Sequence, residues 1–574
     1  MVTYHVSFQN PLSHFLHISL KLEGLSASTL YLQLPAWRPG RYELQHFAQK
    51  IQRFQVLEVE HQPVPFQKIT KDRWEIRCEG LQEVEVRYTF YAYQMDAGGS
   101  WLDETQLYLN PINCLVAVEG REQEPCELSL ALPQDWQIAC GLPEPRAHVL
   151  LAQNYDQLVD SPLIASPSLQ EVTYEVQGLP FHIWIQGDCS PDWQQIRKDF
   201  TAFTQEQLEL FGEFPAADYH YLNQVLPYKH YHGVEHANST VVTLGPAELL
   251  MTPALYKEFL GINSHELFHA WNIKKIRPAE MMPYDYTREN YFRTGFVAEG
   301  LTTYYGDYLL ARSGVFTTEQ YFNELNGVLS KYYDDNGRFN LSVADSSFDL
   351  WLDGYKPGIP DRKVSIYHKG ALAALLLDLN IRKETNNMRS LDDVIRLLWE
   401  DFGKPGIGFT EQDYEAVVAR VLGEPFRSYF EAVIYGTAPL EDLLQEAFDY
   451  VGCRLVTEES VAPSESLYGF KTLLREQTTV VTATVPGSPA WHHLSVDDEI
   501  VAVNGRKVEA NFQILLGEQQ KPVTLSVFRQ KQLRTLSLPV PTAERYLQKY
   551  TVAKKENASY RKQENFRLWL KQDF

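Results

Sequence analysis

The 574-residue chain carries 74 acidic residues against 52 basic ones, which gives a net charge of −22. This balance argues against binding to a nucleic-acid backbone, which relies on lysine and arginine, and it offers no polybasic footprint for an anionic membrane. A length of 574 residues exceeds what one hydrophobic core supports, so we expect several domains.

Cysteine usage and the N-terminal segment indicate the compartment. The six cysteines include no C-x-x-C pair, which favours reduced thiols over a disulfide framework. The first residues lack a basic start followed by an apolar run, and nowhere do 18 apolar residues run together. We therefore predict a cytoplasmic protein that binds neither membrane nor nucleic acid.

The first two regions differ in their hydrophobic period. Residues 1–170 alternate apolar with polar side chains in segments such as HISLKLEGL and EVEVRYTFYAY, which predicts an all-β domain, a sandwich. Residues 171–450 contain one strand-like stretch, YHYLNQVLP, and then a helical period from about 250 to 445. This pattern predicts a mostly helical domain with a small sheet, so the chain is expected to be a multidomain α+β protein.

The C-terminal residues return to short strands and then change again. Residues 455–540 read as a β domain, and Asn504-Gly505 is a hairpin signal within it. Residues 541–574 are charged and helix-prone, which predicts a helical tail exposed to solvent.

A metal-binding pattern lies in the segment N-S-H-E-L-F-H-A-W-N. His265 and His269 are four residues apart, so on a helix both rings face the same side. Glu266 lies about 100° further around the axis and can approach a metal-bound water without being a ligand. Two imidazoles and one carboxylate suit zinc and leave a position open for a water whose pKa the ion lowers.

The third ligand must be a downstream carboxylate. The candidates are Glu280, Asp285, Glu289 and Glu299. Glu299 lies in FVAEGLTTYY, an apolar helical segment in which a buried carboxylate is costly without a cation. The other three lie in polar or proline-containing loop sequence. We therefore predict that His265, His269 and Glu299 hold one zinc ion per chain.

Several segments, taken in order, resemble the glycyl aminopeptidase family of zinc metallopeptidases, whose third ligand is a glutamate. They are LPAWRPGRY, SWLDETQLYLN, HGVEH, HELFHAWNIKKIRP, FVAEGLTTYY and YHKGALAALLLDL. The resemblance covers nearly the whole chain and implies an N-terminal β domain, a thermolysin-like catalytic domain and a C-terminal PDZ domain. One departure is the 29-residue separation of His269 and Glu299, which is longer than in thermolysin-like relatives.

The resemblance also implies roles for further residues. HGVEH looks like the Gly-x-Met-Glu-Asn motif of related aminopeptidases, so Glu235 would pair with the substrate ammonium and the Gly233 backbone with an extended peptide. In similar enzymes a tyrosine in the position of Tyr367, before Lys-Gly, donates a hydrogen bond to the oxyanion. The segment Tyr468, Gly469 and Phe470 resembles the loop with which PDZ domains bind a peptide C-terminus through backbone N–H groups.

The predicted function is that of a zinc metallo-aminopeptidase in which Glu266 acts as general base. By resemblance, it removes glycine, alanine or other small neutral residues from peptides with a free N-terminus, and its PDZ domain binds peptide C-termini. One alternative is a zinc endopeptidase in which Glu235 is structural; activity on acetylated peptides would separate the two. Another is a catalytically inactive PDZ scaffold, against which the intact Glu266 argues.

Overall fold

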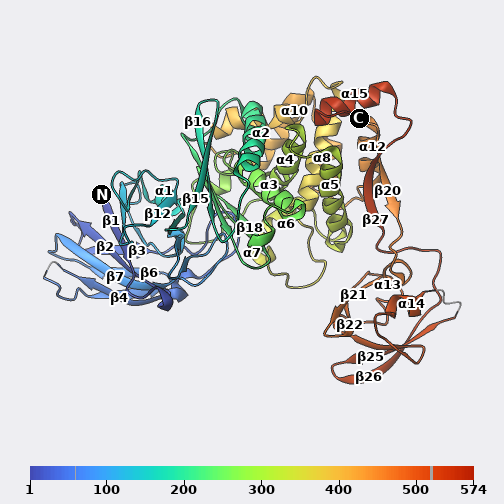
Figure 1. The fold of residues 1–574 in the computed structure, drawn as a ribbon, viewed down its shortest axis with the longest axis horizontal. Helices are drawn as coiled ribbons and strands as arrows, with labels where there is room; N and C mark the ends of the chain where they lie inside the picture. The colour runs from blue at the N-terminus through green and yellow to red at the C-terminus, as the bar shows by residue number, and fades with distance from the viewer. Residues whose placement is uncertain (59, 518–520) are drawn as a thin grey trace.

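The computed structural model describes residues 1–58, 60–517 and 521–574. The chain forms an N-terminal region of sheets, a central region with one sheet and most of the helices, and a C-terminal β unit, which follow one another along the molecule (Figure 1). The multidomain α+β fold predicted from the sequence, with N-terminal sheets and a helical middle, is thereby confirmed.

The N-terminal region contains three sheets. The first has the order β13 (Val149–Ala152), β11 (Cys126–Leu130), β1 (Val2–Ser7), β2 (Phe15–Glu23), β7 (Glu83–Tyr91) and β4 (Ile51–Leu57). The second has the order β10 (Ala117–Val118), β3 (Thr29–Gln33), β6 (Arg73–Arg77) and β5 (Phe66–Thr70), and the third β12 (Gln137–Cys140), β14 (Leu163–Ser166), β9 (Leu107–Leu109) and β8 (Trp101–Leu102). Alternating apolar residues from the first two sheets, such as Leu20 and Leu32, share one core.

A five-stranded sheet opens the central region. Its order is β15 (Gln170–Val176), β16 (Leu179–Gln186), β17 (Tyr219–Val225), β19 (Ser239–Gly245) and β18 (His230–Glu235). Among the residues that the structure describes, β18 pairs with β19 alone and therefore forms an edge of this sheet. An edge strand keeps one row of backbone N–H and C=O groups available for an extended peptide.

The long helices of the central region pack beside this sheet. They are α2 (Trp193–Phe211), α3 (Pro253–Phe268), α4 (Thr302–Arg312), α5 (Thr318–Tyr333) and α8 (His368–Glu384). α3 contacts α4 on one side and the strands β18 and β19 on the other. Shorter helices complete the body: α6 (Val343–Phe348), α7 (Leu350–Asp353), α9 (Leu391–Leu398), α10 (Glu411–Leu422), α11 (Arg427–Tyr429) and α12 (Glu441–Tyr450), with α1 (Tyr155–Val159) in the N-terminal region.

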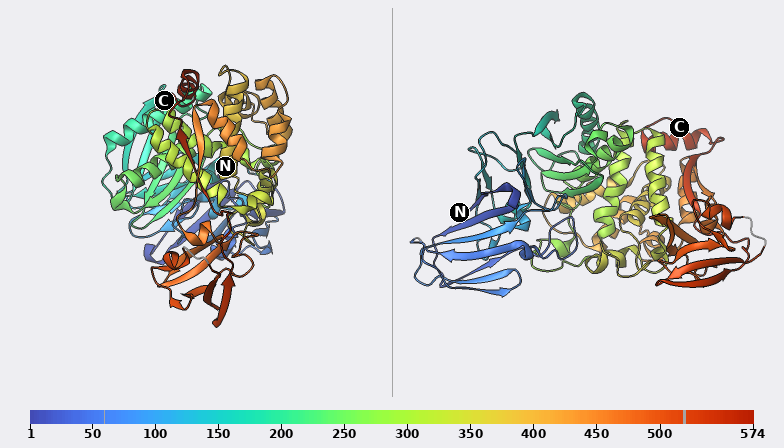
Figure 2. Two further views of the ribbon diagram at one scale, coloured as in Figure 1. Left: turned by 90° about the vertical axis from the view of Figure 1, so that its right-hand side faces the viewer. Right: turned by 60° about the horizontal axis from the view of Figure 1, so that its bottom comes forward.

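The C-terminal β unit is inserted between two paired strands. β20 (Cys453–Glu458) and β27 (Lys549–Lys554) form an antiparallel pair, so the chain leaves the body and returns to it at the same place (Figure 2). The unit contains β21 (Phe470–Arg475), β22 (Thr478–Thr484), β23 (Glu499–Val503), β24 (Arg506–Lys507), β25 (Val523–Arg529), β26 (Gln532–Leu538), α13 (Pro463–Ser466) and α14 (Phe512–Leu516). It has a hydrophobic core of its own.

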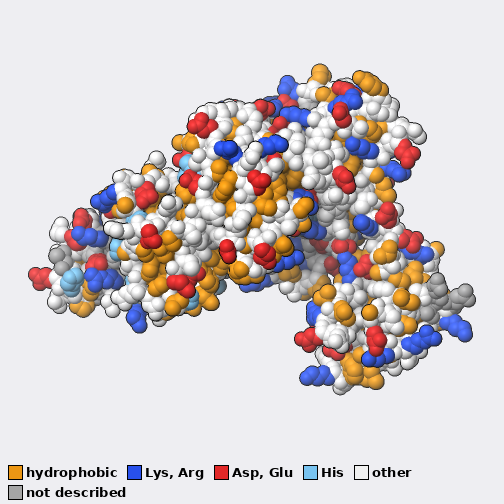
Figure 3. Space-filling model, in the orientation of Figure 1, with side chains coloured by type: hydrophobic (Ala, Val, Ile, Leu, Met, Phe, Trp, Pro, Cys, Tyr) orange, Lys and Arg blue, Asp and Glu red, His pale blue; other side chains and the backbone are white. Residues whose placement is uncertain are grey.

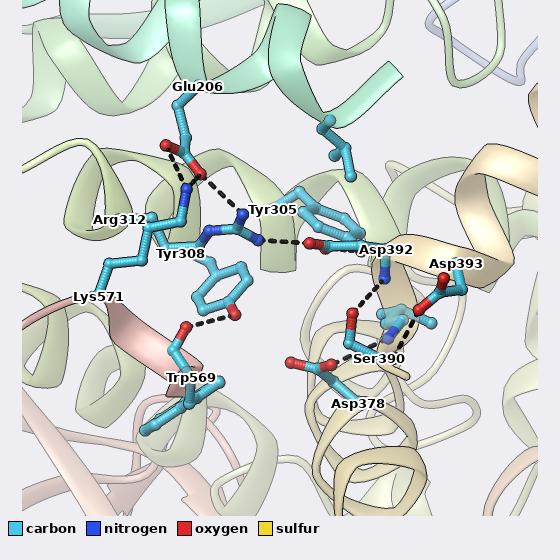
Figure 4. A network of polar contacts seen from close by, with 12 residues as sticks. Glu206, Tyr305, Tyr308, Arg312, Asp378, Ser390, Asp392, Asp393, Trp569 and Lys571 are labelled. Atoms are coloured by element: carbon cyan, nitrogen blue, oxygen red, sulfur yellow. Dashed lines mark hydrogen bonds and ion pairs between the residues drawn. The ribbon is translucent and has the colours of Figure 1, made fainter. Parts of the chain in front are cut away.

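The last segment differs from the helical, solvent-exposed tail predicted from its charge. Residues 549–554 form a strand, and α15 (Tyr560–Leu570) packs on the body with Trp569 fully buried. Tyr308 donates a hydrogen bond to the Trp569 carbonyl at 2.7 Å, and Lys571 pairs with Glu206 at 2.6 Å (Figure 4). The high charge of this segment gave no indication that one face of its helix is apolar. That face packs on the body.

The visible surface agrees with the composition. Acidic and basic side chains are interspersed over the face shown in Figure 3, and the C-terminal unit stands apart from the body. In the described ranges, no helix combines the length and the apolar character that crossing a membrane requires.

Candidate active site

The two histidines lie at the end of α3 with their rings turned toward each other. His265 Nε2 and His269 Nε2 are 3.1 Å apart. His269 Nδ1 lies 2.8 Å from the Asn272 carbonyl, which can accept its proton, and this contact turns Nε2 toward His265. Burial, followed by the neighbouring His269, lowers the pKa of His265 well below its usual value, so this ring is neutral.

Glu299 reaches the same point from η6 (Phe296–Leu301), a π-helical turn that leads into α4. Its Oε2 lies 3.5 Å from His269 Nε2, and Tyr42 donates a hydrogen bond to its Oε1 at 3.1 Å. The turn approaches α8 closely because both sides carry glycine: a Cβ on Gly300 would lie 2.5 Å from the Gly370 Cα. π-Helical turns are often found at functional sites, and this one directs a carboxylate at two imidazoles.

The donor set fits a zinc ion. One ligand atom from each of His265, His269 and Glu299 lies within 4.8 Å of the others. Two facing nitrogen lone pairs repel each other unless a proton or a cation lies between them. Burial lowers the pKa of His269, but Glu299 outweighs burial and raises it to about 10. The carboxylate therefore already favours positive charge at the place that an ion would take, and two imidazoles with one carboxylate are zinc ligands.

Glu266 lies beside this cluster and against the edge strand. It is buried, and its Oε2 has no hydrogen-bond partner among the described residues. A Cβ on Gly233 would lie 2.1 Å from Glu266 Oε1, so only glycine at position 233 leaves room for this carboxylate. Burial raises the pKa of Glu266 well above its usual value, and the charges of Glu235 and Glu299 add to the rise. A carboxyl group with a raised pKa binds a proton more readily, which suits a group that accepts a proton and returns it.

Glu235 is the last residue of β18 and closes one end of the cleft. It is 4% exposed, and its Oε1 has no hydrogen-bond partner within the described ranges. Gly40, from the N-terminal region, lies directly behind it: a Cβ there would be 2.5 Å from Glu235 Oε2. Arg38 interacts electrostatically with both Glu235 and Asp96. The N-terminal region thus walls off the cleft behind a buried carboxylate.

Tyr367 lies immediately before α8 and lines the same cavity. Burial, followed by the charges of Glu299 and Tyr355, raises the pKa of its phenol well above the usual value. The phenol therefore keeps its proton and can donate a hydrogen bond. The neighbouring Tyr355 accepts the Tyr42 backbone N–H at 3.3 Å, which ties this wall to the N-terminal region.

One cavity of about 470 Å³ brings the predicted residues together. Its lining includes His265, Glu266, His269, Glu299, Tyr367, Gly233 and Glu235. The sequence did not identify Gly40, Tyr42 or Tyr355 as parts of this site. Gly40 and Tyr42 belong to the LPAWRPGRY segment, so the resemblance held a signal for them, whereas no motif indicated Tyr355.

The predicted peptide-binding loop lies in the separate C-terminal unit. The side chains of Tyr468 and Phe470 are fully buried there, and Gly469 has a positive φ of 72°. The Gly469 N–H already donates to the Glu465 carbonyl at 3.2 Å. Binding of a carboxylate by this loop stays a prediction, with one of its backbone donors engaged inside the unit.

Known proteins show related sequences and folds. Residues 3–167 match the model of the peptidase M61 N-terminal domain, and residues 258–373 match the M61 glycyl aminopeptidase model. A crystal structure of an aminopeptidase N family protein from Idiomarina loihiensis is similar to 99% of this chain and to 100% of its own, with 28% identity and a TM-score of 0.90.

More distant structures also resemble this chain. An M1 zinc metallopeptidase from Deinococcus radiodurans covers 76% of this chain and 94% of its own, with 14% identity and a TM-score of 0.48. Native yeast LTA4 hydrolase covers 78% of this chain and 71% of its own, with 12% identity and a TM-score of 0.47. No curated protein matched the sequence.

Proposed function

Because this chain belongs to the M61 glycyl aminopeptidase family of zinc metallopeptidases, we propose that it removes residues one at a time from the free N-termini of peptides. His265, His269 and Glu299 would hold the zinc ion, one per chain. The observation that carries the proposal is the buried, unpaired oxygen of Glu235 at the closed end of the cleft.

The environment of Glu235 is suited to an ammonium group. A buried carboxylate without a hydrogen-bond partner is costly, and a charge-assisted bond to a substrate amine would remove that cost. Oxygens of Glu235 and Glu266 and a nitrogen of His269 lie within 4.8 Å of one another, so the amine and the reacting centre are close. Gly40 packs against Glu235 from the N-terminal region, and we take this contact as the closed end of the cleft.

The chemistry follows from the residues around this point. A bound zinc ion supplies Lewis acidity, which lowers the pKa of water and polarises a carbonyl. Glu266 accepts the proton of the attacking water and returns it to the leaving nitrogen. Tyr367 keeps its phenolic proton and donates a hydrogen bond to the oxygen on which negative charge develops. Tyr42 holds Glu299 in place through a hydrogen bond of 3.1 Å.

The substrate residue between Glu235 and the reacting centre would be small and neutral. Support comes from the family and from the short distances between Glu235, Glu266 and His269. The phenol rings of Tyr42 and Tyr355 stand near this space, since Tyr42 contacts Glu299 and Tyr355 lines the cavity. We expect glycine and alanine to be released faster than leucine, phenylalanine or glutamate.

The direct test uses the full chain loaded with zinc and verified by elemental analysis. Amides of glycine, alanine, leucine, phenylalanine and glutamate are compared, together with N-acetyl-alanine amide and an internally quenched peptide whose amine is blocked. Hydrolysis confined to free amines supports the proposal. Hydrolysis of the blocked peptide at a similar rate would instead identify an endopeptidase.

We also propose that the C-terminal unit is a PDZ domain that binds peptide C-termini. Its strand β21 forms an edge of the sheet, and Leu473 and Leu474 on it are exposed, as is Ile514 on α14. An extended peptide could pair with this edge. Fluorescence anisotropy with a peptide library should show binding that is lost when the peptide C-terminus is amidated; equal binding of both forms would contradict the proposal.

A further inference from the structure

The cleft continues past the metal cluster in the direction away from Glu235. Its outer walls come from the helices α3, α4 and α5, and its lining there includes Gly261, Asp307, Gly327, Lys331 and the edge-strand residue Tyr231. These positions have no part in the chemistry proposed above. Their arrangement indicates what lies next to the bond that is cleaved.

The register of β18 relates this outer part to the substrate. Residues 231, 233 and 235 share one face of the strand because side chains alternate. Glu235 would hold the amine and Gly233 lies opposite Glu266, so Tyr231 lies about 7 Å beyond the reacting centre. A peptide that follows the strand would therefore place the residue after the cleaved bond near Tyr231.

The helices α3 and α4 place Asp307 at the level of Tyr231 along the cleft. Gly261 lies one helical turn before His265 on α3, and a Cβ on Gly261 would have only Asp307 Oδ1 as a neighbour, at 3.6 Å, in the described structure. Gly306, the residue before Asp307, packs against the backbone of His265, with its Cβ position 3.2 Å from the His265 Cα. Asp307 thus lies one helical turn from the metal cluster.

Glycines keep this part of the cleft open. Gly261 and Gly327 both lie inside helices, where glycine is less favourable than alanine by about 0.5–1 kcal/mol. At Gly327 nothing from the described remainder of the chain comes within 4 Å of the Cβ position. Neither glycine is required here by close helix packing, unlike Gly306. Both glycines therefore leave space in the wall of the cleft beside Asp307.

The carboxylate of Asp307 faces this space without a hydrogen-bond or ion-pair partner among the described residues. Asp307 forms no hydrogen bond or ion pair with any residue in the described ranges. Lys257 is already paired with Glu324. The groups that act on Asp307 are Glu324, Lys257 and Lys331, and burial raises its pKa to about 7. Glu258 also lines the cleft, so three acidic groups face two lysines.

We propose that Asp307 is a specificity residue for the position after the cleaved bond and that it favours a lysine or arginine side chain there. The aliphatic part of such a side chain would lie along Tyr231 and over Gly261 and Gly327, and its cationic end would meet Asp307. This inference rests on the proposed function, since it assumes that the peptide amine binds at Glu235.

The test compares alanyl-lysine, alanyl-leucine and alanyl-glutamate peptide amides. With the zinc-loaded chain, kcat/KM for alanyl-lysine should exceed that for alanyl-leucine by about tenfold, as expected of a charge-assisted bond. Asp307→Asn should bring this ratio close to one. Glu319→Gln removes an exposed acidic group from the start of α5, outside the cleft, and should leave the ratio unchanged.

A binding measurement separates this inference from the proposed function. Calorimetry with zinc-loaded Glu266→Gln should show the same preference for alanyl-lysine amide, and adding Asp307→Asn should abolish it. If no peptide is hydrolysed by the wild-type chain but this preference is present, the proposed function fails, whereas the preference of Asp307 for a cationic side chain in the bound peptide is retained. Equal binding and equal kcat/KM for the lysine and leucine peptides would overturn the inference, as would a lysine preference that survives Asp307→Asn.

Discussion

The two ends of the cleft differ in how closely the surrounding residues pack. At the Glu235 end the N-terminal region fills the space, and Gly40 is in contact with the carboxylate. At the Asp307 end, Gly261 and Gly327 carry no side chains and therefore leave space in the wall of the cleft. A cleft closed at one end and open at the other would accept a chain by its terminus, as the proposed aminopeptidase activity requires. Each prediction below tests one end or the reacting centre between them.

The largest effect on activity is expected from a substitution at the reacting centre, which lies between the two ends of the cleft. Glu266→Gln should lower kcat by about 10³-fold, because it removes the group that moves the proton. The metal content should stay at one zinc ion per chain by elemental analysis, since this side chain is not a ligand. The exposed Glu248→Gln is the matched control. Turnover within a few-fold of wild type would rule out Glu266 as the base.

The closed end should respond to loss of its charge. Glu235→Gln keeps the shape but cannot form a charge-assisted bond, so KM for peptides with a free amine should rise about 30-fold. The advantage of free over acetylated peptides should shrink by the same factor. Steady-state kinetics on both substrates measure the change, with Glu248→Gln again as the control. An unaltered KM would mean that the amine binds elsewhere.

A substitution in the N-terminal region tests the contact that closes the Glu235 end of the cleft. Gly40→Ala places a methyl group against Glu235 in a backbone conformation with φ of +76°, which should destabilise the fold by about 2 kcal/mol and lower activity. Gly80 has φ of +78° and open space around it, so Gly80→Ala imposes the same backbone strain without the contact. Thermal unfolding and peptide kinetics separate the two. Equal losses of activity in both variants would show that the contact with Glu235 has no role.

At the open end, the unpaired carboxylate of Asp307 should make the stability of the fold depend on pH. Burial, followed by Glu324, raises the pKa of Asp307 from 3.8 to about 7, so the folded state binds this proton more tightly than the unfolded state. The resulting penalty is small below pH 4, grows between pH 4 and pH 7, and is constant above that range. Asp307→Asn should therefore stabilise the protein at pH 8, by about 1–2 kcal/mol once solvent screening is allowed for.

The measurement for this pH dependence is thermal unfolding at pH 4, 6 and 8. The difference in Tm between Asp307→Asn and wild type should increase with pH, while Glu319→Gln should show no such trend. A constant difference would indicate that Asp307 is not destabilised by its surroundings.

The smallest effect is a gain in stability at the open end. Gly327→Ala meets no atom within 4 Å in the part of the chain that the structure describes, so it should stabilise α5 by about 0.5–1 kcal/mol. Gly306→Ala, whose Cβ would lie 3.2 Å from the His265 Cα, should destabilise instead. Chemical denaturation distinguishes the signs. A loss of stability in Gly327→Ala would show that the cleft is narrower than described.

Some of this arrangement was predictable from the sequence because it depends on local geometry. The spacing of His265 and His269 on one helix places both rings on one side, whatever surrounds them. The apolar segment around Glu299 indicated a buried carboxylate that needs a cation. Glu235, Gly233 and Tyr367 came from resemblance, and their positions around one cavity depend on contacts that no spacing reveals.

The C-terminal tail shows where local patterns are insufficient. Its charge predicted an exposed helix, but Trp569 and its apolar neighbours find a matching surface on α4 and α8. Likewise, the pairing of β20 with β27 joins segments that are about 90 residues apart and carry no common signal.

The sequence by itself indicated the candidate ligand types, their helical spacing and the alternation that builds the sheets, because these depend on covalent geometry and on the period of each element. Only the tertiary structure decided which end of the cleft is closed, since Gly40 and Tyr42 reach Glu235 and Glu299 across a domain boundary. The tertiary structure also decided that Asp307 lies in the cleft without an ion-pair partner among the described residues. Packing between distant segments sets such contacts, and the free energy of burial that drives packing does not depend on order along the chain.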